Sequence, residues 1–252
     1  MVKLITTIAC LISLAATQVN AQDAATKSFD GESEASVVII DGLSKSETYG
    51  GKTKNNYKLT DTDIMTIFGK YIKTSTQLTG AASKSETARN WEAGIRYEKV
   101  FVTDLLNGFL QHKAESDPYN GIFTQRDSTD LGAKYFITKD DTLIWFLEAG
   151  ARYATQNPDF TDTDGARSKS TTAARLYTEA SNKFNESTSG KLWVEYVPNF
   201  KSDDFSYSNA EASLTVAMSS ILSLKTAYQV YHREIGLKKD TTTFTTALVA
   251  KY

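Results

Sequence analysis

Residues 240–252, which read DTTTFTTALVAKY, decide the fold of this chain. Successive side chains of an extended strand point to opposite faces, so this stretch divides into two sets. One face carries Phe244, Leu248 and Tyr252 and is mostly apolar, whereas the other begins with threonines and ends with Lys251. The segment is therefore predicted to be a β-strand with one apolar face, and the chain upstream must supply its partners.

An aromatic last residue preceded by alternating apolar positions resembles the C-terminal signal of bacterial outer-membrane barrels. The resemblance implies that Phe244, Leu248 and Tyr252 form an assembly signal read by the barrel-assembly machinery. It also implies that the last strand pairs with the first to close the sheet. The working hypothesis is a transmembrane antiparallel up-and-down β-barrel.

The N-terminus has the features of a secretory signal peptide. Lys3 precedes an apolar run over residues 4–16, and Val19-Asn20-Ala21 supplies a small-x-small cleavage site. We predict a signal peptide over residues 1–21, with cleavage near Ala21. Because Cys10 is removed with it, the mature chain can form no disulfide, thiol nucleophile or cysteine-ligated zinc site.

The remaining length and charge indicate one large domain. The sequence has 252 residues, 13 tyrosines, 12 phenylalanines, only three prolines and a net charge of -2. Such balanced charge gives no reason to expect a nucleic-acid partner. No apolar run after the signal is long enough for a spanning helix, but barrel strands alternate and stay below that threshold.

A repeated unit fills the mature chain. Residues 22–33 are small and polar and are predicted to form a flexible periplasmic tail. From Glu34 to residue 252, the predicted barrel, runs of about ten alternating residues are separated by polar breaks. Twelve runs are predicted, at 34–43, 51–59, 63–73, 90–99, 103–113, 126–137, 142–154, 171–182, 190–199, 206–218, 221–232 and 240–252. An even number places both termini in the periplasm.

The polar breaks alternate in length. Long breaks follow odd runs, at 74–89, 114–125 and 156–170, and short breaks follow even runs, at 60–62, 139–141 and 219–220. Long outer loops and short periplasmic turns are typical of outer-membrane barrels. Two breaks depart from the rule: a short one after the ninth run and a longer one near 183–189. The boundaries of runs eight to ten are therefore not determined by the sequence.

The middle runs indicate which face meets lipid. In the seventh run, Trp145 and Leu147 alternate with Glu148 and Arg152. A soluble β-sandwich has the same period, so the period alone decides nothing. Aromatic residues near the ends of the apolar faces favour the membrane, where they form interfacial girdles. The predicted girdle comprises Trp91, Tyr97, Tyr135, Trp145, Tyr153, Tyr228 and Tyr252.

The sixth and seventh runs also predict a register. A turn centred on Asp141 makes the numbers of paired residues sum to a constant. The pairs are then Asp130 with Arg152, Lys134 with Glu148, and Gly132 with Gly150. Each charged pair joins a carboxylate to a cation. A shift of the register by one residue would exchange the lipid-facing and lumen-facing sets.

Several segments resemble the YdiY-like family of salt-induced outer-membrane proteins, a domain of unknown function. They are ETARNWEAGIRYEKVFVTDLL at 86–106, AESDPYNGIFTQRDSTDLGAKYFITKDDT at 114–142, FLEAGARY at 146–153, FGKY at 68–71 and KKDTTTFTTALVAKY at 238–252. Residues 41–46, DGLSKS, depart from the Thr-Ser-Gly-Asn type of turn expected there. The resemblance implies an outer-membrane barrel linked to salt or osmotic conditions, without catalytic or binding residues.

Charged residues on the predicted inner faces form the candidate site. They are Glu92, Arg96, Asp130, Lys134, Glu148, Arg152, Arg175, Glu179, Glu211 and Lys225. Rings of one charge sign make pores selective, whereas interspersed signs pair with one another. We therefore favour braced walls over a conducting pore. A barrel of twelve strands is intermediate in size between filled eight-stranded barrels and open porins. Size therefore does not decide whether the lumen is open.

Two other sites are weighed and set aside. His112 and His232 suggest a lipid-modifying hydrolase, but no serine stands out beside either and there is no Gly-x-Ser-x-Gly elbow. The acidic segment 159–165 suggests calcium, but Phe160 and Thr171 occupy positions where an EF-hand needs oxygen ligands. We predict neither catalytic residues nor a metal site.

The sequence thus predicts a non-enzymatic barrel in the bacterial outer membrane, acting as a structural or narrow-pore envelope component. It is expected to be a monomer without cofactors or nucleic acid. Its expected partners are outer-membrane lipids, lipopolysaccharide, the assembly machinery and periplasmic chaperones. The alternatives left open are an outer-membrane lipid-modifying hydrolase and a soluble secreted β-protein.

Overall fold

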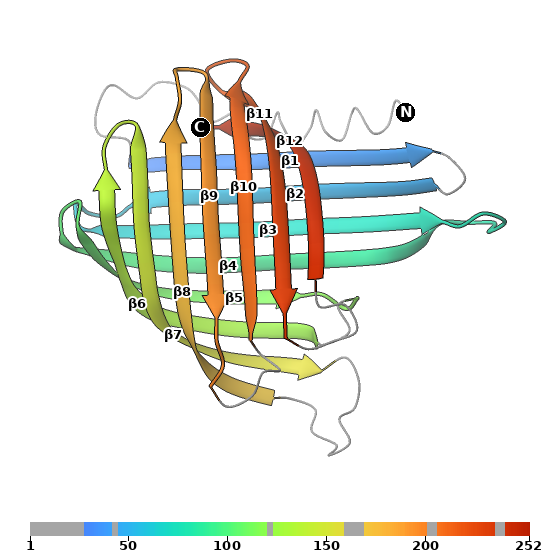
Figure 1. The fold of residues 1–252 in the computed structure, drawn as a ribbon, viewed down its shortest axis with the longest axis horizontal. Coiled ribbons are helices and arrows are strands. Elements are labelled where there is room, and N and C mark those ends of the chain that lie inside the picture. Colours follow the sequence, from blue (N-terminus) through green and yellow to red (C-terminus); the bar gives the residue numbers. More distant parts are fainter. Residues whose placement is uncertain (1–27, 42–44, 120–122, 159–168, 201–205, 235–239) are drawn as a thin grey trace.

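Antiparallel pairing joins each strand to its neighbours in the chain, and the last strand to the first, so the sheet closes into a barrel (Figure 1). The computed structural model describes residues 28–41, 45–119, 123–158, 169–200, 206–234 and 240–252. The strands in these ranges are β1 (Phe29–Asp41), β2 (Lys45–Lys58), β3 (Asp63–Gln77), β4 (Ser85–Val102), β5 (Leu106–Ser116), β6 (Phe123–Lys139), β7 (Leu143–Pro158), β8 (Lys169–Lys183), β9 (Thr188–Val197), β10 (Tyr207–Ala217), β11 (Leu222–Arg233) and β12 (Asp240–Lys251). The predicted fold class, an all-β antiparallel barrel of twelve strands, is confirmed. No helix among the described residues is long and apolar enough to cross a membrane.

The strands extend further than their alternation indicated. β1 begins at Phe29 instead of Glu34, and residues 85–89, expected in a loop, belong to β4. Polar residues occupy both faces near these ends, as in Ser85-Glu86 of β4 and Thr74-Ser75-Thr76 of β3, so the apolar period disappears while pairing continues. Thr48 and Thr74, for example, are joined across β2 and β3 by a hydrogen bond of 2.9 Å. The predicted signal peptide, 1–21, and residues 22–27 of the predicted tail lie outside the described residues.

The two departures from the loop-length rule disappear in the structure. β9 ends at Val197 because Pro198 lacks the N–H that a ladder needs, and β10 begins only at Tyr207. The connection after β9 is therefore long. The one between β8 and β9 is a tight turn in which Asn185 Oδ1 accepts hydrogen bonds of 2.9 Å from the backbone N–H groups of Ser187 and Thr188. All long connections consequently lie at one end of the barrel.

The turn between β6 and β7 shows how the other end is closed. The carboxylate of Asp140 accepts backbone hydrogen bonds of 2.8 Å from Leu143 and Thr142. These bonds stabilise the ionised form and lower the pKa of the Asp140 carboxyl. A three-residue polar turn thus suffices to reverse the chain.

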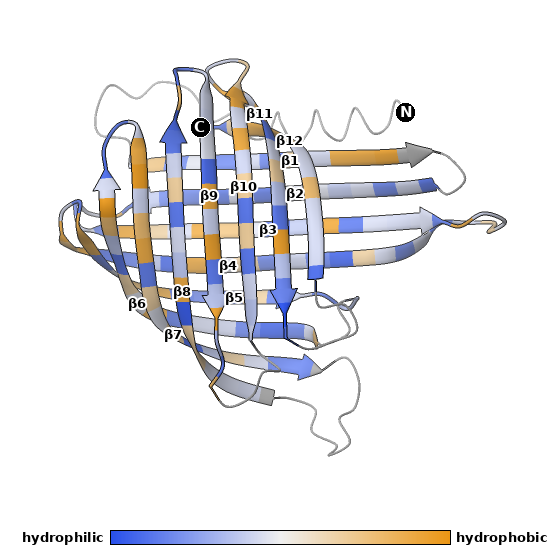
Figure 2. Cartoon of the chain, viewed as in Figure 1, coloured by the Kyte–Doolittle hydropathy of each residue, from blue (hydrophilic) through white to orange (hydrophobic). Residues whose placement is uncertain are grey.

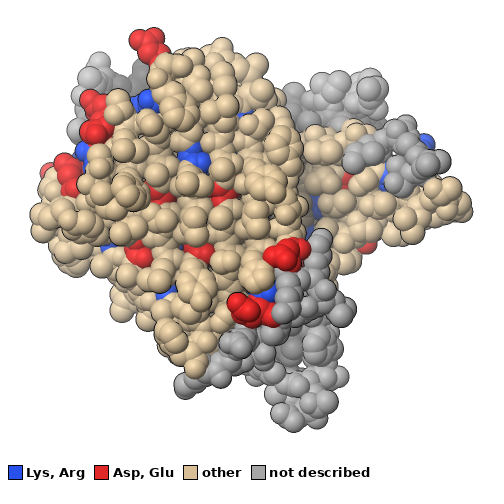
Figure 3. Space-filling view, viewed as in Figure 1, with Lys and Arg blue, Asp and Glu red and all other residues tan. Residues whose placement is uncertain are grey.

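Apolar side chains lie on the outer face and charged ones on the inner face. Trp145 and Leu147 are 40% and 44% exposed, whereas Glu148 and Arg152 are each 4% exposed. Figure 2 shows the resulting alternation of apolar and polar residues along the strands. In Figure 3 most of the visible described surface carries no charge, and the most prominent acidic side chains lie towards its margins. The predicted orientation of β7 is confirmed.

The register predicted for β6 and β7 is also confirmed. Asp130 lies opposite Arg152, Lys134 opposite Glu148 and Gly132 opposite Gly150. The glycine pair has a steric reason. A Cβ atom on Gly132 would lie 2.5 Å from the carbonyl oxygen of Ala149 and 2.8 Å from Cζ of Phe109. Glycine therefore allows the Phe109 ring to lie against the wall.

This close contact gives a stability prediction. Gly132→Ala should lower the free energy of unfolding by about 1–3 kcal/mol, because the strands or the Phe109 ring must shift. Denaturant unfolding of the barrel in detergent micelles measures the loss. Gly51→Ala is the matched control, since a Cβ there would lie 3.9 Å from the nearest atom, the Glu34 carbonyl oxygen. Equal losses in the two variants would contradict the steric explanation.

Closure of the barrel depends on a short interface between β1 and β12. The paired residues run only from Glu32 with Lys251 to Ala35 with Leu248. Backbone hydrogen bonds of 3.0 and 3.1 Å between Gly31 and Tyr252 extend the pairing by one residue. By contrast, β1 pairs with β2 along its whole length. The start of β1 and the end of β12 thus meet at the end of the barrel that carries the tight turns.

Candidate functional site: the charged lumen

The ten charged residues predicted to line the lumen lie on the inner face of the barrel. Asp130, Glu148, Arg152 and Arg175 are the most enclosed, with 1–5% of their surface exposed. Nine of the ten, all except Asp130, line one polar lumen cavity. Alternation places them there, because each lies on the face opposite the apolar side chains of its strand.

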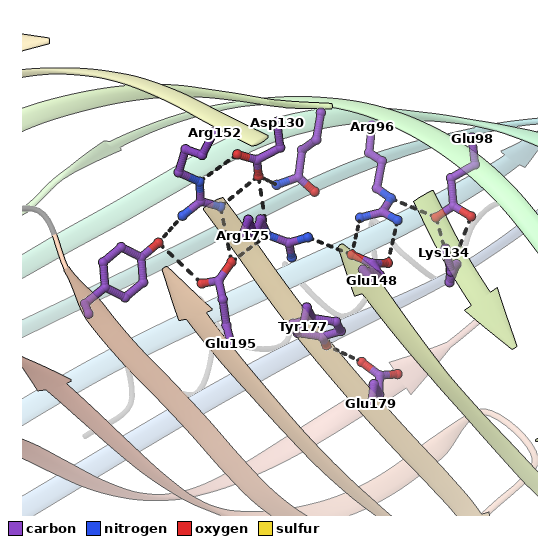
Figure 4. A network of polar contacts seen from close by, with 12 residues as sticks. Arg96, Glu98, Asp130, Lys134, Glu148, Arg152, Arg175, Tyr177, Glu179 and Glu195 are labelled. Atoms are coloured by element: carbon purple, nitrogen blue, oxygen red, sulfur yellow. Dashed lines mark hydrogen bonds and ion pairs between the residues drawn. The ribbon is translucent and has the colours of Figure 1, made fainter. Parts of the chain in front are cut away.

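Glu148 on β7 joins two arginines from different strands. Its carboxylate accepts two hydrogen bonds from Arg96 on β4, at 2.6 and 3.1 Å. It accepts a third, at 2.7 Å, from Nη1 of Arg175 on β8 (Figure 4). The pairing with Arg96 spans the lumen, since β4 and β7 are not neighbours in the sheet. Two-pronged arginine–carboxylate contacts are among the strongest hydrogen bonds in proteins.

A second cluster of ion pairs lies beside the cluster around Glu148. Arg152 donates two hydrogen bonds to Asp130, at 2.6 and 2.7 Å, and one of 3.1 Å to Glu195 on β9. Arg175 donates a hydrogen bond of 2.7 Å to the same Glu195 oxygen. Arg152 also contacts the hydroxyl of Tyr207. Arg175 therefore links the two clusters of ion pairs into one network.

Glu98 and Lys134 complete the network. Arg96 Nε donates to Glu98 at 2.7 Å, and the Lys134 ammonium lies 3.1 Å from the same carboxylate. We call the following eight residues the arginine network: Arg96, Glu98, Asp130, Lys134, Glu148, Arg152, Arg175 and Glu195. It contains four cations and four anions, so its formal charge is zero. Such mutual neutralisation allows these groups to be enclosed together.

Aromatic rings pack against the cations of the network. The guanidinium carbon of Arg96 lies 4.1 Å from the centroid of the Phe109 ring. The ammonium of Lys134 lies 4.3 Å from the centroid of Phe146. Cation–π attraction adds to the ion pairs, and the rings fill space between them. This part of the lumen is therefore packed with side chains.

Two smaller ion clusters occupy other parts of the lumen. In one, Lys113 lies 2.8 Å from Glu115, which also contacts Arg126. In the other, the Lys225 ammonium lies 2.9 Å from Glu34 and 3.3 Å from Glu211. The second cluster joins β11 to β1 and to β10. It lies on the side of the barrel that carries the short β1–β12 interface.

Sequence reasoning missed several of these residues. Glu98 lies two residues after Arg96 and so on the same face, which was a usable signal. Glu195 lies three residues before Pro198, near the end of its strand, and was not among the predicted lumen residues. Tyr207 offered no charge pattern, and its place beside Arg152 follows from the curvature of the barrel. Register arguments reach adjacent strands, whereas contacts across the lumen depend on the closed shape.

Three adjoining polar cavities lie in the lumen. Their volumes are about 400, 180 and 550 Å³. The first includes Asp140 and Thr142 of the turn between β6 and β7, and the second includes Ile72 and Thr243 nearer the long connections. Lys225 lines all three cavities. We call this series of cavities the lumen passage.

The predicted girdle aromatics lie at the outer surface to different extents. Tyr97, Tyr135, Trp145, Tyr153 and Tyr228 are 40–54% exposed. Trp91 and Tyr252 are half-buried. In the predicted assembly signal, Phe244 is 68% and Leu248 is 37% exposed.

The two histidines lie apart from the lumen passage. His112 Nδ1 is 3.0 Å from the hydroxyl of Thr129 at an exposed position. His232 Nδ1 lies 2.7 Å from Asp240. The register also places Ser208 directly opposite His232, a neighbour that the sequence analysis did not find. No hydrogen bond joins Ser208 to His232 among the described residues. The acidic segment 159–165 lies outside those residues.

Comparisons with known proteins give a family and a fold. The sequence model of a family described as "Protein of unknown function, DUF481" matches residues 33–252. A search of the curated proteins finds no match.

Among solved structures, the chain resembles an outer-membrane channel from Pseudomonas putida F1, with 12% sequence identity, a TM-score of 0.56, and coverage of 94% of this chain and 98% of that one. The translocator domain of the autotransporter NalP from Neisseria meningitidis gives 10% identity and a TM-score of 0.47 over 98% of this chain and 97% of that one. The KdgM porin gives 8% identity and a TM-score of 0.46 over 88% of this chain and 99% of that one. At 12% identity the channel supports the fold alone.

Proposed function

We propose that this chain, which belongs to the DUF481 family of unknown function, is a bacterial outer-membrane barrel that conducts small ions through a narrow polar passage. The observation that carries the proposal is the lumen passage, whose three cavities adjoin at Lys225. The arginine network fills the lumen beside it. The barrel would therefore be braced on one side and hydrated on the other, so that it would have both the braced walls favoured by the sequence analysis and a narrow pore.

The membrane assignment rests on the distribution of polarity. Leu131, Leu147 and Leu176 are 44–65% exposed on the outer face, whereas the ionised groups are enclosed. In water this distribution would leave apolar side chains solvated around the whole wall, which soluble proteins avoid. In a bilayer the same side chains contact hydrocarbon. Outer-membrane lipids and lipopolysaccharide are accordingly the proposed surroundings.

Fractionation tests this assignment. The chain should sediment with outer membranes, require detergent for extraction and migrate differently on gels before and after heating. A protein recovered from the soluble periplasmic or secreted fraction would overturn the assignment and favour the soluble β-protein.

Conductance in planar bilayers tests the passage. The folded protein should give small unitary currents, and Lys225→Ala should enlarge them and shift selectivity towards cations. The reason is that Glu34 and Glu211 would remain in the passage without the ammonium that pairs with them. Lys99→Ala is the matched control, because Lys99 pairs with Asp63 at the strand ends, 3.0 Å away. The absence of current steps from folded protein would leave only the bracing role.

The proposed link to salt conditions has a physical basis in the same passage. Its ion pairs face the cavities, so dissolved ions that enter the passage would weaken them. Side chains such as Lys225, which is 9% exposed, would then move more freely at high salt. Unitary conductance should rise more steeply than the conductivity of the bulk solution, and a strictly proportional rise would remove the link.

We propose that the chain is not an enzyme. Ser208, His232 and Asp240 form a cross-strand row in the order that a hydrolytic triad requires. However, a nucleophile and its base need a hydrogen bond, and Ser208 and His232 lack one. Purified protein should hydrolyse phospholipid no faster than its Ser208→Ala variant. Activity that disappears in this variant would favour the outer-membrane hydrolase.

A further inference from the structure

The wall of the barrel is incomplete between β1 and β12. Beyond Ala35 and Leu248, no described residue of either strand pairs across this seam. Figure 1 shows β12 bending away while β1 continues, and Figure 2 shows an apolar stretch on β1 where the two strands diverge. Unpaired strand edges are not tolerated in contact with lipid, but they occur where they line a hydrated cavity. The seam is therefore an opening.

A cavity of about 730 Å³ lies at the start of this opening, around the last paired residues, Ala35 and Leu248. It is lined by consecutive residues of both strands, 33–35 at the end of the paired stretch of β1 and 246–248 of β12, where the two strands begin to separate. Consecutive side chains of a strand point to opposite faces. A cavity that touches three in a row on each border must pass from the inner to the outer surface. It thus connects the lumen passage with the lipid-facing side.

The two ends of this cavity differ in chemistry. The outer mouth is apolar, and its side chains include Val37, Leu224 and Leu248, which are 36–40% exposed. Lys52 and Lys70 lie at the inner end and are cross-strand neighbours. The cavity is consequently amphipathic, with apolar side chains outside and charged side chains, Lys52, Lys70, Glu34 and Glu92, inside.

The two lysines are paired weakly or not at all with the carboxylates beside them. Glu34 lies 2.9 Å from Lys225 but 4.0 Å from Lys52. Glu92, opposite Lys70 in the register, lies 3.8 Å from Lys113. Glu34 and Glu92 line the same cavity but are each engaged with another lysine, and the ammonium of Lys70 has no carboxylate within ion-pair distance among the described residues.

We propose that this opening binds a single-chain amphiphile with a carboxylate head, of the long-chain fatty acid class. The alkyl chain lies between β1 and β12, and the head meets Lys52 and Lys70. The volume is within the range of cavities that hold one small ligand. The site rests on the membrane-spanning part of the proposed function and is independent of ion conduction.

Photo-crosslinking in phosphatidylcholine nanodiscs tests the site with palmitate that carries a diazirine at its chain end. Labelling should concentrate on β1, β11 and β12 near Ala35, Leu224 and Leu248, and excess unlabelled palmitate should displace it. Labelling spread evenly around the barrel, or not displaced, would overturn the proposal. Displacement of the label by phosphatidylglycerol but not by palmitate would also overturn the proposal. It would identify the opening as a binding site for a membrane phospholipid.

Two matched pairs of variants test the apolar outer mouth and the lysine end of the site separately. Ala35→Trp should abolish displaceable labelling by filling the outer mouth, whereas Ala93→Trp on the outer face of β4 should not. Replacing both Lys52 and Lys70 by Met should weaken palmitate binding roughly tenfold or more, as expected for lost charge-assisted hydrogen bonds. Lys54→Met, on the same strand but outside the cavity, should have little effect. Unchanged binding in Ala35→Trp would contradict the site even if conduction and fractionation behave as proposed.

Discussion

Glu148→Gln is expected to lower the free energy of unfolding by about 3–5 kcal/mol, the cost of leaving enclosed charges without their partner. Glu148 is 4% exposed and accepts three hydrogen bonds from two guanidinium groups. The amide keeps the shape but loses the charge, and its NH₂ group would face a guanidinium donor. Arg96 and Arg175 would each lose a counter-charge. Denaturant unfolding in detergent micelles, followed by tryptophan fluorescence, measures the loss.

The control is the same substitution at a more hydrated lumen position. The side chain of Glu92 is 28% exposed and lies 3.8 Å from its partner Lys113. Glu92→Gln should therefore cost no more than about 1 kcal/mol, as for weakly buried ion pairs. Equal losses at both positions would show that the arginine network does not hold the wall together.

A double-mutant cycle separates the interaction energy of Arg96 with Glu148 from the cost of burying each charge. Arg96→Met combined with Glu148→Gln should cost less than the sum of the two single changes, because the second removes a charge that the first left unpaired. Additive losses would mean that the two side chains act independently in spite of their contact.

Tyr252→Ala should be nearly as damaging, with a loss of about 3–4 kcal/mol for a packed aromatic side chain and its hydrogen bonds. The Tyr252 ring stacks on Phe29 with a centroid distance of 5.7 Å. Its hydroxyl donates to Asn55 at 2.9 Å and lies 3.1 Å from the Ser33 hydroxyl. Because β1 and β12 pair over so few residues, these contacts hold the barrel closed. The temperature at which gel mobility changes on heating should fall.

Two further variants divide this effect into its parts. Tyr252→Phe keeps the stacked ring and should lose only about 1 kcal/mol, the contribution of the hydroxyl hydrogen bonds. Phe244→Ala lies on the same strand and face, is 68% exposed and has no partner on β1. It should leave stability almost unchanged. A Phe244→Ala loss as large as that of Tyr252→Ala would contradict the role of the seam.

The same variants address the proposed assembly signal. Loss of Tyr252 could act through stability or through recognition during biogenesis. Refolding the purified variant into detergent isolates the first effect, because no assembly machinery is present. A variant that refolds normally but fails to reach the outer membrane in cells would assign Tyr252 to recognition.

Local chemistry was sufficient for much of the architecture. Alternation in residues 142–154 determined which side of β7 faces outward, because a strand has only two faces. The opposite charges of Asp130 and Arg152, with a short turn between their strands, determined the register of β6 and β7. By contrast, the end of β3 and the start of β4 could not be located, since polar residues on both faces, such as Thr74-Ser75 and Ser85-Glu86, remove the period while backbone pairing continues.

By itself, the sequence determined the strand count, the facing of the middle strands and the short-range pairs, because each of these depends on residues near one another in the chain. Only the tertiary structure decided that Arg96 and Arg175 share Glu148 and that Tyr207 contacts Arg152. It alone revealed that β1 and β12 separate beyond Ala35. Contacts across a closed barrel and gaps between its edges depend on the tilt and curvature of all the strands together, and no single segment encodes these.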